Sequence, residues 1–184
     1  MPEDNVSAKR ALRAEMKARR AAEPCRAEKD FALAQNFFSL PAVREAWIFF
    51  LYRSFSSEAG TSLIAERLLS EGKQVLFPRV DGANMVAVQW KGQAFRKGAF
   101  GIEEPQGEPY EGKIDVCALP LLAADADFAR LGYGGGFYDR FLSDRQIYKI
   151  GVCYDFQIVG KVPGEPHDVL LDAIATDKHI YIRR

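Results

Sequence analysis

The chain has 184 residues, of which 48% are hydrophobic and 27% are charged. This is enough to bury one sizeable core and too few for two ordinary domains, so we expect a single domain over 1–184. The 25 basic and 25 acidic residues cancel, so the overall charge favours neither nucleic acid nor a membrane surface as a partner. We expect a monomer whose partners are small molecules.

Signals for export and for metal binding by cysteine are missing from the sequence. No run approaches the roughly 18 apolar residues of a membrane helix, and the N-terminus lacks the hydrophobic core of a secretory signal. The cysteines at 25, 117 and 153 are widely spaced and form no Cys-x-x-Cys pair. We therefore expect a cytoplasmic protein with reduced thiols.

The first predicted element is a helix over 7–22, rich in Ala, Leu, Met, Lys and Arg, with Ser7 as its expected N-cap. Four cations recur along it at three- and four-residue spacing and so share one face. They are Lys9, Arg13, Lys17 and Arg20. Charged helical faces are ordinarily solvated, and the pattern alone predicts that this face points to solvent.

Short apolar runs then alternate with helical patterns along the chain. The helical patterns cover 26–38, 61–70 and 137–142, and the strand patterns cover 46–52, 74–80, 85–90, 116–122 and 149–154. A glycine- and proline-rich stretch at 91–113 predicts a long irregular excursion, and 180–182 is either a last edge strand or a disordered tail. The alternation predicts an α/β fold, with a mostly parallel, Rossmann-like sheet flanked by helices on both faces.

Residues 130–140 carry the clearest functional signal, Arg-Leu-Gly-Tyr-Gly-Gly-Gly-Phe-Tyr-Asp-Arg. Glycines let backbone N–H groups approach a ligand that a Cβ would exclude. Between a strand and a helix N-terminus, and flanked by Arg130 and Arg140, such a loop favours a phosphate group. A tight surface turn is the alternative. The segment fits neither the Walker pattern nor G-x-G-x-x-G.

Other polar residues follow predicted strands, where an α/β sheet ordinarily binds its ligands. Arg53 and Glu58 follow the first strand; the alternative for Glu58 is a solvent-facing acid in the first turn of the next helix. Asp139 and Asp168 supply the oxygen ligands that Mg²⁺ accepts together with phosphate. The sequence before Asp168 is also typical of a turn, which leaves a purely structural role open for that residue.

Taken together, these features resemble the 5-formyltetrahydrofolate cyclo-ligase family, also called methenyltetrahydrofolate synthetases. The matching fragments run in order along almost the whole chain: Lys9 to Arg13, Glu58, Phe77-Pro78-Arg79, Gly101-Ile102-Glu103-Glu104-Pro105, Asp115 with Pro120, 130–140, and Val162-Pro163 followed by His167-Asp168. Each fragment is weak alone, and their order and spacing make the match specific. The resemblance implies a fold similar to that of sugar-phosphate isomerases and CoA transferases.

The resemblance also implies a role for particular positions. ATP contacts fall on Lys9, Arg10, Ala11, Leu12 and Arg13, and on Arg130, Leu131, Gly132, Tyr133, Gly134, Gly135, Gly136, Phe137 and Tyr138. Arg130 and Tyr138 are the implied catalytic residues, Arg53 and Glu58 the folate contacts, and Asp139 and Asp168 the Mg²⁺ ligands. The aromatic candidates for the pterin are Phe137, Tyr138, Tyr52 and Trp90. No role is implied for Lys17 and Arg20, which keep the solvent-facing expectation.

The implied reaction converts 5-formyltetrahydrofolate to 5,10-methenyltetrahydrofolate, with ATP consumed to ADP and phosphate. The formyl oxygen takes the γ-phosphoryl group and the bridge nitrogen then closes the ring, so that catalysis rests on positioning and charge stabilisation. Two positions depart from the family pattern: Phe128 stands where glycine is usual, and Gly135 where some members have lysine.

Two other kinds of function remain open from the residues themselves. A sugar-phosphate isomerase or acyl-CoA transferase would need a carboxylate base and no ATP. A non-catalytic nucleotide- or folate-binding protein would use the same glycine loop and show ligand affinity without turnover.

Overall fold

The structure, a computed structural model, describes residues 2–98, 101–165 and 168–184. Its helices are α1 (Pro2–Ala21), α2 (Arg26–Ser39), α3 (Pro41–Glu45), α4 (Ser62–Ser70) and α5 (Phe137–Leu142). The strands of the central sheet are β1 (Ile48–Phe50), β2 (Gln74–Asp81), β3 (Asn84–Gln89), β6 (Val116–Pro120), β9 (Tyr148–Val152), β10 (Ala173–Ala175) and β11 (Ile180–Ile182). Two small hairpins pair β4 (Phe95–Lys97) with β5 (Glu103–Pro105) and β7 (Ala123–Ala124) with β8 (Arg130–Leu131).

The central sheet is mostly parallel, as predicted. Among the described residues its order is β11-β10-β9-β6-β1-β2-β3. The five inner strands pair in parallel, and the edge strands β3 and β11 are antiparallel to their neighbours. The carboxyl ends of β1, β6 and β9 therefore meet at one edge of the sheet, where a ligand site of an α/β protein is expected.

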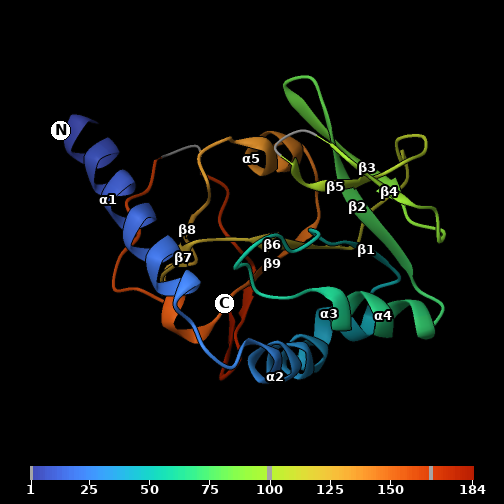
Figure 1. Cartoon of the computed structure of the whole chain (residues 1–184), viewed down its shortest axis with the longest axis horizontal. Coiled ribbons are helices and arrows are strands. Elements are labelled where there is room, and N and C mark those ends of the chain that lie inside the picture. The colour runs from blue at the N-terminus through green and yellow to red at the C-terminus, as the bar shows by residue number, and fades with distance from the viewer. Residues whose placement is uncertain (1, 99–100, 166–167) are drawn as a thin grey trace.

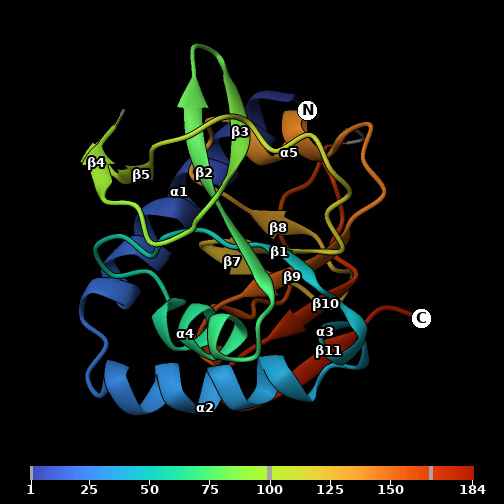
Figure 2. The same ribbon diagram turned by 90° about the vertical axis from the view of Figure 1, so that its right-hand side faces the viewer.

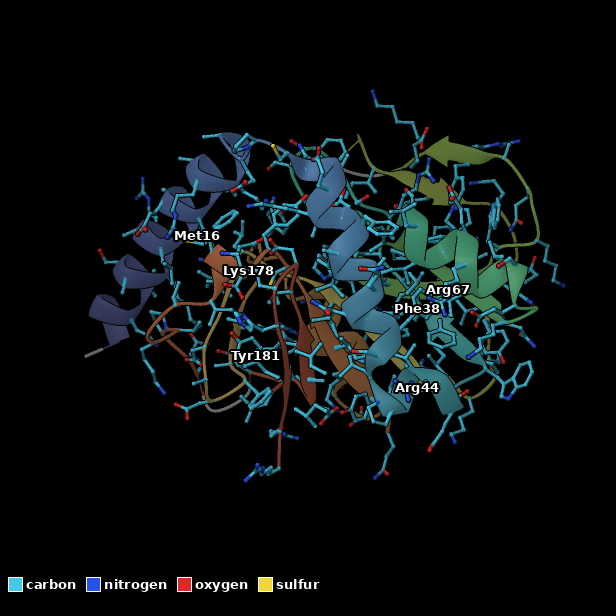
Figure 3. All side chains as sticks on the ribbon, turned by 90° about the horizontal axis from the view of Figure 1, so that it is seen from below. Met16, Phe38, Arg44, Arg67, Lys178 and Tyr181 are labelled. Atoms are coloured by element: carbon cyan, nitrogen blue, oxygen red, sulfur yellow. The ribbon has the colours of Figure 1, made fainter. Side chains whose placement is uncertain are left out.

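Helices cover both faces of the sheet, because successive side chains of each buried strand point to opposite sides. Phe49 and Val75 pack into the layer formed with α2, α3 and α4, whereas Phe50 packs toward α5, its ring 4.8 Å from that of Phe141. Figures 1 and 2 show α2 and α4 on one face and α5 on the other. On the first face the Arg67 guanidinium of α4 stacks 4.0 Å from the Phe38 ring of α2 (Figure 3).

Helix α1 packs away from the main sheet, against the β7–β8 hairpin (Figure 1). Met16 is fully buried there, in a cluster with Leu122, Leu131 and Val162. Since β8 leads directly into the glycine loop at 132–136, this packing brings the cations of α1 to that loop. Among the described residues, no helix is both long and apolar enough to cross a membrane.

Several predicted boundaries differ from the structure. Helix α1 begins at Pro2, so Ser7 is not its N-cap; proline suits the first helical position because its φ is already helical. Pro41, which follows the end of α2, is likewise the first residue of α3. The stretch at 91–113 is not irregular throughout, since it contains the β4–β5 hairpin. Residues 180–182 form the edge strand β11, and β10, which pairs with it, was not predicted.

The departure at Phe128 has a structural consequence, because this residue has a φ of 63°, in the left-handed region. The buried Asp125 carboxylate holds the turn by accepting hydrogen bonds from the N–H groups of Asp127 (3.0 Å) and Ala129 (3.1 Å). Glycine adopts this conformation without the steric cost of a Cβ. The glycine that the resemblance implies at this position would therefore suit the backbone found here.

We expect the Phe128→Gly variant to be more stable than Phe128→Ala by about 1 kcal/mol. Both variants lose the same ring, and only alanine keeps the Cβ that disfavours a positive φ. Urea denaturation of the two variants measures the difference. Equal free energies of unfolding would mean that the turn relaxes to a negative φ when the ring is removed.

Candidate functional site

The glycine loop leaves β8 and enters α5 through two glycines with positive φ. Gly134 has a φ of 99°, and Gly136, the N-cap of α5, has a φ of 66°. Arg13 of α1 lies against this loop: its Nε donates to the Gly132 carbonyl at 2.9 Å, and a Cβ at Gly134 would meet its Nη2 at 3.4 Å. The loop conformation and the close approach of α1 therefore both favour glycine at 134.

Arg130 and Asp139 form an ion pair beside the loop. The Arg130 Nη2 to Asp139 Oδ1 distance is 2.8 Å, and the Arg130 side chain is only 6% exposed. Its Nε is buried and has no hydrogen-bond partner among the residues that the structure describes. A buried charged donor without an acceptor is costly. The site thus offers a donor that a bound anion could satisfy.

The second predicted metal ligand, Asp168, lies against the N-terminal half of α1, while its neighbour His167 lies outside the described residues. Lys9 Nζ is 3.3 Å from Asp168 Oδ2 and 3.1 Å from Glu165 Oε1. The neighbouring Val169 N–H donates to Asp139 Oδ1 at 3.4 Å, which brings the segment after Asp168 to the Arg130–Asp139 pair.

The donors present limit which metal the site could hold. Within the described ranges, no three His, Cys, Asp or Glu side chains gather as a metal site. Two carboxylates suit Mg²⁺ only when phosphate oxygens and water complete its shell. Asp139 and Asp168 fit that requirement in donor type, and both now pair with cations, Arg130 and Lys9.

Glu58 lies in the loop after β1 and is buried, only 8% exposed, so it is not the solvent-facing acid of the alternative interpretation. Its Oε2 accepts the Phe55 N–H at 2.8 Å, and the Tyr133 hydroxyl of the glycine loop lies near the same carboxylate. Burial raises the pKa of Glu58 above its usual value, against the opposing effects of Phe55, Tyr133 and the Arg20 guanidinium. This carboxylate therefore lies beside the predicted ATP loop.

Arg53 is drawn toward the β4–β5 hairpin instead of the glycine loop. Its Nε donates to Glu103 Oε2 at 2.8 Å, and its guanidinium stacks 4.1 Å from the Phe95 ring. Trp90 stacks on the same Phe95 ring, with 6.0 Å between the ring centroids. Phe95 of the hairpin and Trp90 thus form an aromatic cluster beside β2. The prediction of an irregular excursion at 91–113 did not include this cluster.

The other predicted positions differ in how accessible they are. Tyr52 is buried, with its hydroxyl donating to the Ala59 carbonyl at 2.7 Å, so it serves the core. Tyr138 packs on Phe50, 6.2 Å between centroids, and burial raises its pKa well above the ordinary value, so it stays protonated at neutral pH. On α1, Arg10 and Ala11 are exposed, and Leu12 packs with the Met16 cluster.

Arg20 is the important residue that sequence reasoning missed. It is 3% exposed, so the expectation that it faces solvent was wrong, whereas Lys17 is exposed as predicted. Arg20 lies four residues after the fully buried Met16, which places both on the same side of the helix. That spacing was the available signal, although a cation on the border of an apolar stripe ordinarily snorkels to solvent.

These elements define an α/β protein with a glycine loop whose amides, cations and carboxylates gather at one edge of a parallel sheet. The family model described as the 5-formyltetrahydrofolate cyclo-ligase family matches residues 5–177. The chain therefore belongs to the 5-formyltetrahydrofolate cyclo-ligase family and is a ligase.

Individual relatives agree with this assignment. The 5-formyltetrahydrofolate cyclo-ligase of Mycolicibacterium smegmatis is 36% identical over 178 residues, covering 80% of this chain and 91% of the relative. The Escherichia coli enzyme of the same name is 31% identical over 159 residues, covering 80% and 87%. The solved structure of Aquifex aeolicus 5,10-methenyltetrahydrofolate synthetase superposes with a TM-score of 0.84 at 28% identity, covering 95% of this chain and 92% of that one.

Proposed function

We propose that this chain catalyses the ATP-dependent conversion of 5-formyltetrahydrofolate to 5,10-methenyltetrahydrofolate, with release of ADP and phosphate. Residues 1–184 act as one domain, a monomer, in this proposal. The observation that carries it is the convergence of three segments: Arg13 of α1 donates to the glycine loop at Gly132, and Arg20 of α1 donates both to Tyr133 of that loop and to Ser57, the neighbour of Glu58. A phosphate loop and a buried carboxylate acceptor are what two such substrates require.

ATP would bind between α1 and the glycine loop. Lys9, Arg13 and Arg130 supply positive charge for the triphosphate, and the unpartnered Nε of Arg130 supplies a buried donor for a phosphate oxygen. The backbone of 130–138 would follow the nucleotide, as the family resemblance implies. When phosphate binds, its oxygens compensate the cations that Asp139 and Asp168 now neutralise.

Mg²⁺ would be held by Asp139 and Asp168. Bound there, the ion would neutralise charge on the phosphate oxygens during transfer. The two ion pairs would then exchange partners. Arg130 and Lys9 would turn to the phosphate oxygens, which would release Asp139 and Asp168 to bind the ion.

The folate would bind against Glu58, whose ionised carboxylate accepts hydrogen bonds from the N–H edge of the pterin. Phe137 and Tyr138, at the start of α5, are partly buried and are the aromatic contacts we favour, since Tyr52 is committed to the core. Arg53 would contribute from the opposite side, together with the β4–β5 hairpin that holds it.

The formyl group is an amide carbonyl, a poor electrophile whose oxygen is a poor leaving group. In the proposed reaction this oxygen attacks the γ-phosphorus and the bond to ADP breaks. The bridge nitrogen then attacks the activated carbon and loses its proton, and phosphate departs with the electron pair of the C–O bond. Arg130 would stabilise the transferred phosphoryl charge, and the protonated Tyr138 would donate a hydrogen bond in the site.

This mechanism predicts the fate of one atom. Substrate labelled with oxygen-18 in the formyl group should yield labelled inorganic phosphate, in a one-to-one ratio with the methenyl product. Mass spectrometry of the released phosphate measures the transfer. Label appearing in water or retained by the folate would contradict phosphorylation of the formyl oxygen.

A further inference from the structure

Arg20 joins three segments that are far apart in the sequence. Its Nε donates to Ser57 Oγ at 3.2 Å in the loop after β1, and its Nη1 donates to the Leu121 carbonyl at 3.3 Å after β6. Its Nη2 donates to the Tyr133 hydroxyl in the glycine loop. The planar guanidinium can make these contacts at once because its donors point in fixed directions.

Tyr133 continues this connection. Its hydroxyl accepts from Arg20 and lies near the Glu58 carboxylate, while the residue as a whole is 45% exposed. The cations of Lys17 and Arg20 each lie 5.5 Å from the ring centroid. The hydroxyl is thus anchored on the inner side of the loop, and the ring remains beside the region where the nucleotide would bind.

We propose that Arg20 is a positioning residue that couples the two substrates: through Tyr133 it holds the ATP loop against Glu58, so that binding of one substrate orders the site for the other. This inference rests on the proposed function and adds a device for binding cooperativity. Because Arg20 is buried and donates to Tyr133 in one loop and to Ser57 in the other, its effect on the substrates passes through these two residues. A ligand that fixes the glycine loop therefore fixes the acceptor of the folate as well.

The charged groups around Glu58 give the role of Arg20 a second readout, the pH dependence of kcat/KM for the folate. The groups that face it are Arg20 from α1, Tyr133 from the glycine loop, Tyr138 from α5 and Tyr52 after β1, with Arg26 of α2 donating to its backbone carbonyl at 3.4 Å. Arg20 is the cation that lowers the pKa of Glu58 against the effect of burial. Without it, that pKa rises further, and the pH below which folate binding fails moves upward.

The test measures binding of 5-formyltetrahydrofolate by calorimetry, with and without Mg²⁺ and a non-hydrolysable ATP analogue. In the wild-type protein the analogue should tighten folate binding at least about 5-fold. Arg20→Gln should abolish this gain and shift the acidic limb of kcat/KM for the folate to higher pH. Arg20→Lys keeps the charge but not the three directed donors, so it should restore the acidic limb and not the coupling. The control Arg19→Gln, an exposed neighbour on α1, should behave as wild type.

A folded Arg20→Gln protein with unchanged coupling and an unchanged acidic limb would overturn the inference. Should that variant fail to fold, Tyr133→Phe decides, because it removes only the exposed loop residue's hydroxyl; lost coupling supports the inference and retained coupling overturns it. Absence of methenyl product with the wild-type protein would contradict the proposed function itself, whereas active wild type with uncoupled binding would contradict only the role of Arg20.

Discussion

The Asp139→Asn variant should lose at least about 100-fold in kcat/KM for Mg²⁺-ATP, the loss typical of removing one charge-stabilising group from an active site. Asparagine keeps the size of the side chain but removes the charge that pairs with Arg130 at 2.8 Å and that would hold Mg²⁺. The variant should also require a higher Mg²⁺ concentration for half-maximal rate, because a neutral amide is a weaker ligand for a hard cation. Initial rates over a Mg²⁺ titration measure both effects.

Asp144→Asn provides the matched control, since Asp144 is an exposed carboxylate just beyond α5. It should leave both the rate and the Mg²⁺ requirement unchanged. Thermal unfolding of the two variants separates loss of structure from loss of a ligand. Wild-type turnover and Mg²⁺ dependence in Asp139→Asn would refute the metal role.

The Glu58→Gln variant should lose about 10- to 100-fold in kcat/KM for 5-formyltetrahydrofolate, the equivalent of one hydrogen bond to a charged group. Glutamine offers the pterin edge one neutral acceptor where the carboxylate offers two charged oxygens. Binding of ATP alone should be affected far less, because Arg13, Lys9 and Arg130 remain. Steady-state kinetics with each substrate varied in turn separates the two effects.

The same variant should be at least as stable as wild type at neutral pH. Burial raises the pKa of Glu58 in the folded protein, so the folded state holds this proton more tightly than the unfolded state. The stability that the protonated Glu58 side chain contributes is therefore lost as pH rises through its folded pKa. Above that pH the buried, ionised carboxylate destabilises the fold, and a neutral glutamine does not. The Tm difference between variant and wild type should thus grow from acidic to neutral pH.

Glu66→Gln, at an exposed glutamate of α4, is the control and should change neither activity nor the pH dependence of Tm. A Glu58→Gln protein that is less stable than wild type and fully active would mean that the carboxylate serves the fold. A variant that is more stable and less active would mean that the carboxylate lowers the stability of the fold and is needed for activity.

The sequence predicted those elements whose own residues determine them. Helix α5 was predicted at 137–142, as found, because glycines end the preceding loop and an amphipathic turn follows at once. Helices α2 and α4 and the long strand β2 carry clear apolar periods. Strands β8 and β10 have two and three residues, too short for any period, and their pairing with β7, β9 and β11 defines them.

The candidate site was predictable as a set of residues and not as a network. The glycine loop and its flanking charges stand out locally, yet the contact of Lys9 with Asp168 spans 159 positions. The role of Arg20 depends on α1 packing against the β7–β8 hairpin, which a helical pattern cannot reveal. Local chemistry therefore singled out the glycine loop as a candidate site, and only tertiary packing explains how that loop comes close to Glu58.

The most direct test of the proposed activity follows the near-ultraviolet absorbance of the methenyl product. Purified protein is mixed with 5-formyltetrahydrofolate and Mg²⁺, with ATP added to one sample and withheld from the other. The account predicts a rise in absorbance only with ATP, matched by release of ADP. Folded protein that binds both ligands without any rise, or that gives the same rise without ATP, would contradict it.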